Sequence, residues 1–262
     1  MRLVRFGVDD SPARFGVLDG SDKIRVLAEP FDTASATGEV LDLADVRLRA
    51  PVLPTTKIIG VGRNYAAHAA ELGNELPDRP LLFLKPASAI QDPGAPIVLP
   101  AFSADTQHEA ELAVVIGRRG KDVTTARATE MILGYTVAND VTARDIQRRD
   151  VQFTRGKGFD TSCPLGPWIE TDLPPGDLRV RALVDGEQRQ DGHTGQMIFG
   201  VPELIADISA AFTLLPGDVI LTGTPAGVGP LAAGQTVTVE VEGIGVLTNP
   251  VVDDPARPKP SS

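Results

Sequence analysis

The sequence predicts a mainly β protein of the α+β class, a β-roll or sandwich with peripheral helices. Glycine and proline total 26 and 22 of the 262 residues, and they separate short apolar runs in the way typical of short strands joined by turns. The few segments with helical spacing do not alternate regularly with these runs, and no internal repeat is present. This irregular order argues against a doubly wound sheet or a TIM barrel.

Composition narrows the class of protein further. Hydrophobic residues make up 42% of the chain, enough for a large core, and the net charge is −10. Such an acidic protein repels phosphate backbones and anionic lipids, so we expect neither a nucleic-acid nor a membrane partner. No apolar run approaches the ~18 residues of a membrane span or has the form of a signal peptide, which favours a cytoplasmic protein. A single cysteine, Cys163, excludes an intramolecular disulfide.

We predict a small N-terminal β domain over residues 1–52. Its short strands are expected at 2–8, 13–20 and 23–29, joined by turns rich in Asp and Gly. The segment 41–54 contains prolines and is interpreted as a linker into the main domain, residues 53–252. A flexible tail is expected over residues 253–262.

The main domain is expected to contain strands separated by a few short helices. Helices are predicted at 64–73, which ends at Gly73, at 142–150, where Thr142 and Asp145 have capping-box spacing, and at 202–212. A helical start is also expected for the segment 129–140, which then becomes a strand. The other strands are predicted at 57–62, 80–86, 108–117 and 217–225, with hairpins at 179–190, turning at Asp185-Gly186, and at 236–251, turning near Gly243.

Two carboxylates share one face of the strand predicted at 108–117. Side chains alternate along a strand, so Glu109 and Glu111 point the same way while Ala110 and Leu112 face the core. Two buried like charges repel, and a divalent cation with a preference for oxygen ligands would relieve that repulsion. The alternative is an ordinary solvated strand edge. His108 lies on the opposite face and is not expected to be a ligand.

Other polar residues are candidates for the same site. Asp140 ends a predicted strand and could supply a third carboxylate, although Asn139-Asp140 could equally form a plain turn. His68 and Glu71 are three residues apart on a helix, which suits a general base oriented by a carboxylate, or simply a surface pair.

Two lysines and two glycine-rich segments also have a functional and a plain structural interpretation. Lys85, in an apolar strand end, and Lys157, in a loop flanked by glycines, could each hold a carboxylate or an enolate oxygen, or could simply be solvated. The segment 222–230 lacks the Gly-Lys-Ser/Thr ending of a phosphate loop. The segment 57–66 has Tyr65 where a dinucleotide fingerprint needs its third glycine, so neither motif predicts a nucleotide site.

Six segments in this order resemble the fumarylacetoacetate hydrolase (FAH) superfamily: VGRNYAAHAAE, FLKP, HEAELAVVIG, ANDVTARDIQ, RGKGFDTSCPLGP and LTGTPAGVGP. Each motif is modest, but together they are specific and cover about residues 56–250. The likeness is to short members that act as acylpyruvate hydrolases, oxaloacetate decarboxylases or 2-hydroxyhepta-2,4-diene-1,7-dioate isomerases.

The resemblance implies a FAH-type β-roll, usually homodimeric, with Mg²⁺ or Mn²⁺ held by Glu109, Glu111 and Asp140. It implies that His68 and Glu71 lie on a helix that orders over the substrate, and that Lys157 takes part in catalysis. The residues that fall where family members contact substrate or activate water are Lys85, Gln147 and Thr224, with Arg63 and Tyr65 beside the helix.

These implications predict a metal-dependent enzyme that acts on small 2-oxo acids through an enolate stabilised by the metal. The outcome could be hydrolysis of the C–C bond of acylpyruvates or decarboxylation of oxaloacetate-like substrates. Isomerisation or decarboxylation of a 2-hydroxyhepta-2,4-diene-1,7-dioate in aromatic catabolism is the alternative. A non-catalytic metal-binding β domain, or a purely structural module, remains open from the sequence.

Overall fold

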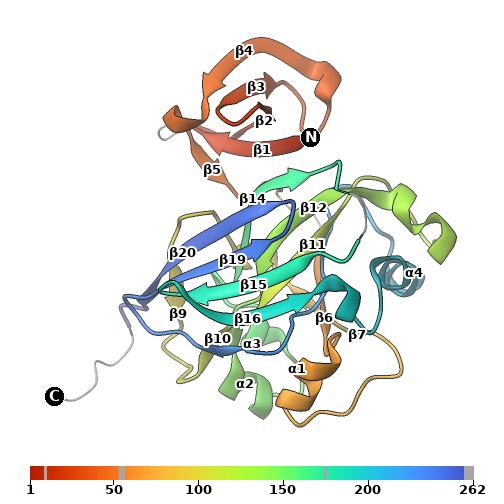
Figure 1. The fold of residues 1–262 in the computed structure, drawn as a ribbon, viewed down its shortest axis with the longest axis vertical. Coiled ribbons are helices and arrows are strands. Elements are labelled where there is room, and N and C mark those ends of the chain that lie inside the picture. The colour runs from red at the N-terminus through yellow and green to blue at the C-terminus, as the bar shows by residue number, and fades with distance from the viewer. Residues whose placement is uncertain (9–10, 53–56, 174–175, 257–262) are drawn as a thin grey trace.

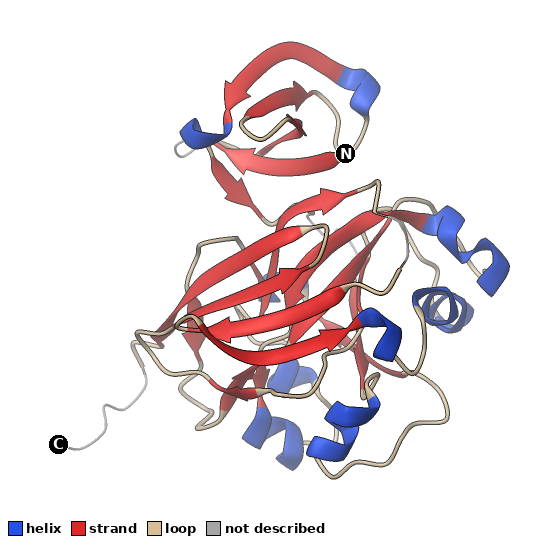
Figure 2. Cartoon of the chain, in the orientation of Figure 1, coloured by secondary structure: helices blue, strands red, loops and turns tan. Residues whose placement is uncertain are grey.

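The computed structural model describes residues 1–8, 11–52, 57–173 and 176–256, and it confirms the mainly β class (Figures 1 and 2). The largest sheet has 12 strands, ordered β4-β3-β2-β1-β14-β12-β11-β17-β6-β7, with β5 paired to β1 and β8 to β14. Its strands are β1 (Arg2–Gly7), β2 (Arg14–Asp19), β3 (Lys23–Leu27), β4 (Ala36–Asp42), β5 (Arg47–Arg49), β6 (Ile58–Gly62), β7 (Leu81–Lys85), β8 (Ile90–Gln91), β11 (Ala110–Ile116), β12 (Ile132–Asn139), β14 (Cys163–Glu170) and β17 (Val219–Leu221).

Two smaller sheets complete the β structure. A five-stranded sheet is ordered β16-β15-β19-β20-β9, and a three-stranded sheet β13-β10-β18. Their strands are β9 (Ile97–Leu99), β10 (Thr106–His108), β13 (Thr142–Ala143), β15 (Arg179–Val184), β16 (Glu187–His193), β18 (Gly229–Pro230), β19 (Thr236–Val241) and β20 (Gly245–Asp253).

Helices lie at the periphery of the sheets, as expected. They are α1 (Ala66–Glu71), α2 (Arg144–Arg149), α3 (Thr154–Lys157) and α4 (Val201–Ala211), with 3₁₀ turns η1 (Thr33–Ser35), η2 (Leu43–Asp45), η3 (Ala87–Ala89), η4 (Thr125–Met131) and η5 (Thr194–Gln196). Figure 1 shows α1, α2 and α3 gathered at the end of the molecule opposite the N-terminal strands. Within the described residues, no helix is long and apolar enough to cross a membrane.

Strand β11 forms the centre of the molecule and is buried on both faces. The alternate residues Ala110, Leu112, Val114 and Ile116 pack against α4 and the five-stranded sheet. Ala113 and Val115 face the other way, into a second apolar cluster. The alternation predicted from the sequence is therefore present, and it directs the side chain of Glu111 away from the first core.

Both predicted hairpins are present. The β15–β16 turn places Asp185 and Gly186 at φ of 52° and 82°, the left-handed conformation that a two-residue turn of this kind requires. The second hairpin, β19–β20, turns through Gly243 at φ 77°. These turns place Gln190, in the middle of β16, within hydrogen-bonding distance of Ala110 at the start of β11, beside the functional site.

Four local predictions differ from the structure. Thr142 does not cap α2, because its hydroxyl donates to the carbonyl of Asp140 and the helix begins after Ala143. The expected linker 41–54 contains β5, which pairs with β1, while residues 53–56 lie outside the described part. The expected strand 108–117 is divided, with Glu109 between β10 and β11. Of the predicted tail, Asp253 ends β20 and residues 257–262 lie outside the described part.

Candidate metal centre and active site

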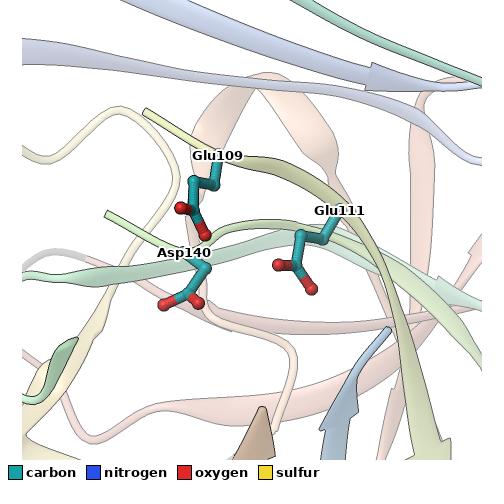
Figure 3. Close-up of side chains that lie close together, drawn as sticks. All are labelled: Glu109, Glu111 and Asp140. Atoms are coloured by element: carbon teal, nitrogen blue, oxygen red, sulfur yellow. The ribbon is translucent and has the colours of Figure 1, made fainter. Parts of the chain in front are cut away.

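Three carboxylates converge at the start of β11. Glu109 immediately precedes this strand, Glu111 is its second residue, and Asp140 follows the end of the adjacent strand β12 (Figure 3). The amide of Asp140 donates to the carbonyl of Glu109 over 2.8 Å, so the backbone pairing itself brings the two side chains together. One oxygen from each of the three residues lies within 4.8 Å of the others, and all three side chains are buried.

Three cationic side chains surround this carboxylate cluster. The Lys157 ammonium lies 2.6 Å from both Glu109 Oε2 and Asp140 Oδ2. Lys85 lies 2.5 Å from Asp140 Oδ1, and Arg144 donates to Glu109 Oε1. The cations are themselves 2–3% exposed, so their charges are compensated by these contacts rather than by water.

Burial and neighbouring charges shift the pKa values of Glu109 and Glu111 in opposite directions. Burial alone would raise the pKa of Glu109, but the charges of Lys157 and Arg144 outweigh it, and the pKa lies well below its usual range. Burial, reinforced by the charges of Asp140 and Glu109, raises the pKa of Glu111 well above its usual range. Glu111 accepts a hydrogen bond from the amide of Gly223 at 2.7 Å but has no ion pair within the described chain.

The donor set fits a hard divalent cation. Three closely spaced carboxylates are ligands that Mg²⁺ and Mn²⁺ prefer, and a bound cation would favour the ionised form of Glu111, which burial and the neighbouring carboxylates otherwise disfavour. Three carboxylates and three side-chain cations already balance in formal charge. A bound divalent ion would therefore give the centre a net positive charge, which suits an anionic, chelating ligand.

A cavity of about 320 Å³ opens onto this cluster and is large enough for a small metabolite. Glu109 and Glu111 line it, whereas Asp140 does not, and the other polar residues of the lining are Arg63, His68, Asn74, Arg144, Gln147, Arg148, Lys157 and Thr224. The cationic lining residues outnumber the acidic ones, although the protein as a whole carries a net charge of −10.

Helix α1 brings a histidine–carboxylate pair to the cavity. His68 Nδ1 lies 3.2 Å from Glu71 Oε2, and the same carboxylate accepts the amide of Gly227 at 3.0 Å. Since a carboxylate only accepts, this contact assigns the proton to Nδ1 and leaves Nε2 of a neutral ring unprotonated. His68 lines the cavity, whereas Glu71 lies behind it.

Two residues expected to contact substrate lie elsewhere. Lys85 is outside the cavity lining, where its ammonium holds Asp140 and the carbonyl of Ser162. Tyr65 precedes α1 and lines a different depression, and its buried hydroxyl has no hydrogen-bond partner among the residues that the structure describes. Burial and the charge of Glu111 raise the pKa of that hydroxyl. Gln147, Arg63 and Thr224 do line the cavity.

Sequence reasoning missed two residues of the site. The first is Arg144, inside the VTARDIQ segment, which the sequence does not mark as a site residue because an arginine in a short helix normally reaches solvent. In the structure it is buried against Glu109 and also donates to Gln107 and Gln147. Gln190, on β16, contacts the backbone of the metal-centre strand from the opposite sheet. No local signal in the sequence distinguishes it from its exposed neighbours.

A β-roll with a buried acidic cluster and a cation-lined cavity defines an enzyme-like architecture. Residues 57–252 match the family model described as fumarylacetoacetate (FAA) hydrolase C-terminal, and residues 1–51 match the one described as Rv2993c-like, N-terminal. The chain belongs to the fumarylacetoacetate hydrolase family.

Three similar proteins carry informative names. A mitochondrial oxaloacetate decarboxylase of Dictyostelium discoideum is 46% identical over 72% of this chain and 89% of its own. The structure of a 5-carboxymethyl-2-hydroxymuconate delta-isomerase from Mycobacterium smegmatis is 51% identical, with a TM-score of 0.90 over 97% of this chain and 100% of its own. A fumarylpyruvate hydrolase from Pseudomonas aeruginosa, in complex with Mn²⁺ and pyruvate, is 34% identical, with a TM-score of 0.72 over 79% and 92% of the two chains. This chain is therefore an enzyme of the family that acts on a small molecule.

Proposed function

We propose that this chain is a Mg²⁺- or Mn²⁺-dependent enzyme that carries small 2-oxo acids through an enolate. Its reaction is hydrolysis of the C–C bond of acylpyruvates or decarboxylation of oxaloacetate. The observation that carries this proposal is the convergence of Glu109, Glu111 and Asp140 within 4.8 Å, where Glu109 and Glu111 line a cavity rich in cations. The Mn²⁺- and pyruvate-bound state named for the Pseudomonas relative supports the same class of ligand.

The bound cation would supply Lewis acidity at a chelated 2-oxo acid. Lys157 is fixed by Glu109, Asp140 and the hydroxyl of Thr142, and its ammonium is available to offset negative charge that develops on substrate oxygen. Burial alone would lower the pKa of Lys157, but the charges of Asp140 and Glu109 raise it, so the side chain acts as a fixed cation rather than as a base.

His68 is the proposed general base, because its Nε2 lone pair is left free when Nδ1 donates to Glu71. In hydrolysis it would take a proton from water, and Glu71 would hold the ring orientation and stabilise the protonated imidazole. Decarboxylation needs no attacking water, so it depends less on this base.

Arg63 is the proposed anchor for an anionic group of the substrate. It lines the cavity, and its side chain has no hydrogen-bond or ion-pair partner among the described residues. Its backbone has φ 57°, a left-handed conformation that costs a non-glycine residue free energy. A strained, unpartnered cation beside a metal centre suits recognition of a carboxylate.

Isomerisation is the second candidate reaction, since the Mycobacterium smegmatis delta-isomerase is similar over nearly the whole chain, including the N-terminal strands. A base that removes a proton from water can also remove one from carbon, so the same His68 serves both reactions. A non-catalytic metal-binding role would leave the cation-lined cavity without a purpose.

We further propose a homodimer in the cytoplasm. Strand β7 ends the large sheet in the main body, opposite β4 at the N-terminal end, and the apolar side chain of Leu84 on β7 is 47% exposed. Sheet edges with exposed apolar side chains are normally covered by another chain.

The decisive experiment assays oxaloacetate, acetylpyruvate and a carboxymethyl-hydroxymuconate with Mg²⁺, Mn²⁺ or excess EDTA. We expect metal-dependent turnover of at least one substrate and its loss in EDTA. Full activity after exhaustive EDTA treatment, or no turnover of any of these acids, would refute the proposal.

A histidine variant separates the candidate reactions. His68→Asn should slow acylpyruvate hydrolysis by about 10²–10⁴-fold, the usual contribution of a general base, while oxaloacetate decarboxylation falls much less. His193→Asn, at a half-exposed histidine outside the cavity, is the matched control and should change neither rate. An equal loss of both reactions in His68→Asn would favour proton transfer at carbon, as in isomerisation.

A further inference from the structure

Gln190 is a buried amide that joins the two backbone segments supporting the metal centre. It lies on β16 in the five-stranded sheet and is 0% exposed. Its Oε1 accepts the amide of Ala110, which stands between Glu109 and Glu111, at 2.9 Å. Its Nε2 donates to Thr224 Oγ1 and to the carbonyl of Pro225, both at 2.7 Å.

The orientation of this amide is determined by backbone groups. The Ala110 N–H can only donate and the Pro225 carbonyl can only accept, so Oε1 and Nε2 cannot exchange places. His108 Nδ1, 3.0 Å from Oε1, is then the fourth partner. All four hydrogen-bonding positions of the Gln190 amide are used, which is the condition for a buried polar group to rigidify its surroundings.

This orientation of the Gln190 amide determines which hydrogen bond the Thr224 hydroxyl donates and which one it accepts. The hydroxyl accepts from Gln190 Nε2 and donates its single proton to the carbonyl of Ala110 at 2.8 Å. Thr224 lines the cavity and is 3% exposed. With its proton committed, the oxygen has only a lone pair to offer to the cavity.

The position of Thr224 follows from the sheet. Strand β17 runs antiparallel to β11, and residues 222–225 continue past the end of β17 beside the start of β11. The amide and hydroxyl of Thr222 both donate to the carbonyl of Leu112, at 3.1 and 2.9 Å, and the amide of Gly223 donates to Glu111. Gln190 adds the next link in this series, because it bonds both the amide of Ala110 and the hydroxyl of Thr224.

We propose that Gln190 is a positioning residue that fixes Thr224 as a hydrogen-bond acceptor toward the cavity, so that Thr224 selects a ligand or water O–H group rather than a carboxylate or keto oxygen. This inference rests on the proposed function for the identity of the ligands. A 2-hydroxy acid, an enol or a water molecule would satisfy Thr224, whereas a keto oxygen would need the cationic side chains of the cavity instead.

The ligand half of the proposal is tested by a matched pair of probes. Dissociation constants of lactate, which carries a donor O–H, and pyruvate, which does not, are measured by calorimetry on Mn²⁺-loaded protein. Thr224→Val should weaken lactate about three- to tenfold relative to pyruvate, the range of one hydrogen bond, and Thr224→Ser should restore the ratio. Selective weakening of pyruvate, or an unchanged ratio, would overturn the assignment.

The positioning half is tested without turnover. Gln190→Met leaves the Ala110 amide and the Pro225 carbonyl unpaired, so we expect a melting temperature lower by roughly 5 °C or more in EDTA. We also expect about tenfold weaker binding of Mn²⁺ alone, because the strand holding Glu109 and Glu111 is released.

Gln188→Met is the control, since Gln188 lies two residues earlier on the same strand and its exposed side chain donates to the exposed Asp191. Equal melting temperatures and Mn²⁺ affinities in the two variants would contradict the positioning role. If Gln190→Met does not fold, Thr224→Val still tests the polarity. Failure of wild-type, Mn²⁺-loaded protein to bind either acid would instead count against the proposed function.

Discussion

The N-terminal strands and the main body bury different kinds of side chain. In the described part of residues 1–52, every buried side chain is apolar, from Leu3 to Val52. The buried polar and charged side chains of the described chain all lie at or after Asn64, and they include the three carboxylates of the candidate metal centre and the three cations that contact them. Because burying a charge costs free energy even when it is paired, such a cluster is retained for function rather than stability.

The two regions are nevertheless one sheet and share a core. Strand β1 pairs with β14 at Leu3↔Ile169, and Leu3, Val17 and Leu27 pack in the same apolar cluster as Leu165 and Ile169. The two regions therefore belong to one continuous structure, but only the main body buries the polar and charged side chains of the candidate site. An N-terminal substitution should change stability alone, and a cluster substitution should change activity, sometimes with the opposite effect on stability.

Glu111→Gln should produce the largest effect. Removal of this carboxylate should lower kcat/KM by more than about a hundredfold, since changes to outer partners of a metal site already cost up to that much. Because burial and neighbouring carboxylates raise the pKa of Glu111, the neutral amide should leave the EDTA-treated protein as stable as wild type or more stable. Steady-state kinetics measure kcat/KM, melting curves measure the stability, and calorimetry measures the Mn²⁺ affinity, which should fall as well.

The N-terminal control for that variant is Glu39→Gln. Glu39 forms an exposed pair with Arg14, and its loss should leave Mn²⁺ affinity and rate unchanged. A Glu111→Gln protein that bound Mn²⁺ normally would contradict the assigned site.

Lys157→Met should destabilise the metal-free protein by about 3–5 kcal/mol, the cost of leaving buried charges without their partner. Glu109 and Asp140 would then lie together with no ammonium between them. Excess Mn²⁺ should recover part of the loss. Lys23→Met, at an exposed pair with Asp42, should leave the free energy of unfolding nearly unchanged. Urea unfolding with and without Mn²⁺ gives the free energies of unfolding.

Leu3→Ala tests whether the two regions unfold together. Leu3 is 2% exposed in the shared core, so truncation should cost about 2–5 kcal/mol and keep a single unfolding transition. Val40→Ala, at a side chain 55% exposed on β4, should cost little. Two separate transitions in the Leu3→Ala calorimetric scan would show that the N-terminal strands are an independent unit.

Local patterning made much of the fold predictable. The period-2 alternation of Glu109 to Ile116 gave the correct faces of β11, and Asp185-Gly186 gave the position of a hairpin, because both signals depend on residues adjacent in the chain. The same is true of His68 and Glu71, which one helical turn brings together. Family resemblance supplied the remaining link between these segments.

Contacts between distant segments were not predictable in this way. Gln190 reaches Ala110 across 80 positions, and Arg144 becomes a buried partner of Glu109 only because α2 packs under β10. Thr142 shows the competing effect. Its spacing to Asp145 suited a cap, but its hydroxyl bonds the Asp140 carbonyl while Asp145 binds Ser103 and the amide of Ala104. Tertiary contacts outweighed the local rule.

Arg63→Gly should weaken substrate binding while keeping or slightly raising the free energy of unfolding, and both effects should be smaller than those above. Glycine tolerates φ 57°, so stability should be unchanged or raised by at most about 1 kcal/mol, while KM for a dicarboxylate rises about tenfold through loss of the cation. Asp122→Gly is the matched control, because Asp122 also has a positive φ, 51°, but lies at the surface. An unchanged KM in Arg63→Gly would remove this residue from the proposed substrate contacts.

Cys163→Ala should have the smallest effect, a change in how the free energy of unfolding depends on pH that is confined to alkaline pH. This thiol lies in the core shared by both regions, and burial raises its pKa from 9.0 to about 12. The folded protein therefore keeps a proton that the unfolded chain loses, so the stabilisation is complete below pH 9 and is lost as the pH rises toward 12. The free energy of unfolding should fall less steeply between pH 9 and 11 in Cys163→Ala than in wild type, apart from a constant offset for the small cavity. Identical slopes in urea titrations of the two proteins would mean that the thiol is accessible to water, and that the two regions do not seal their common core.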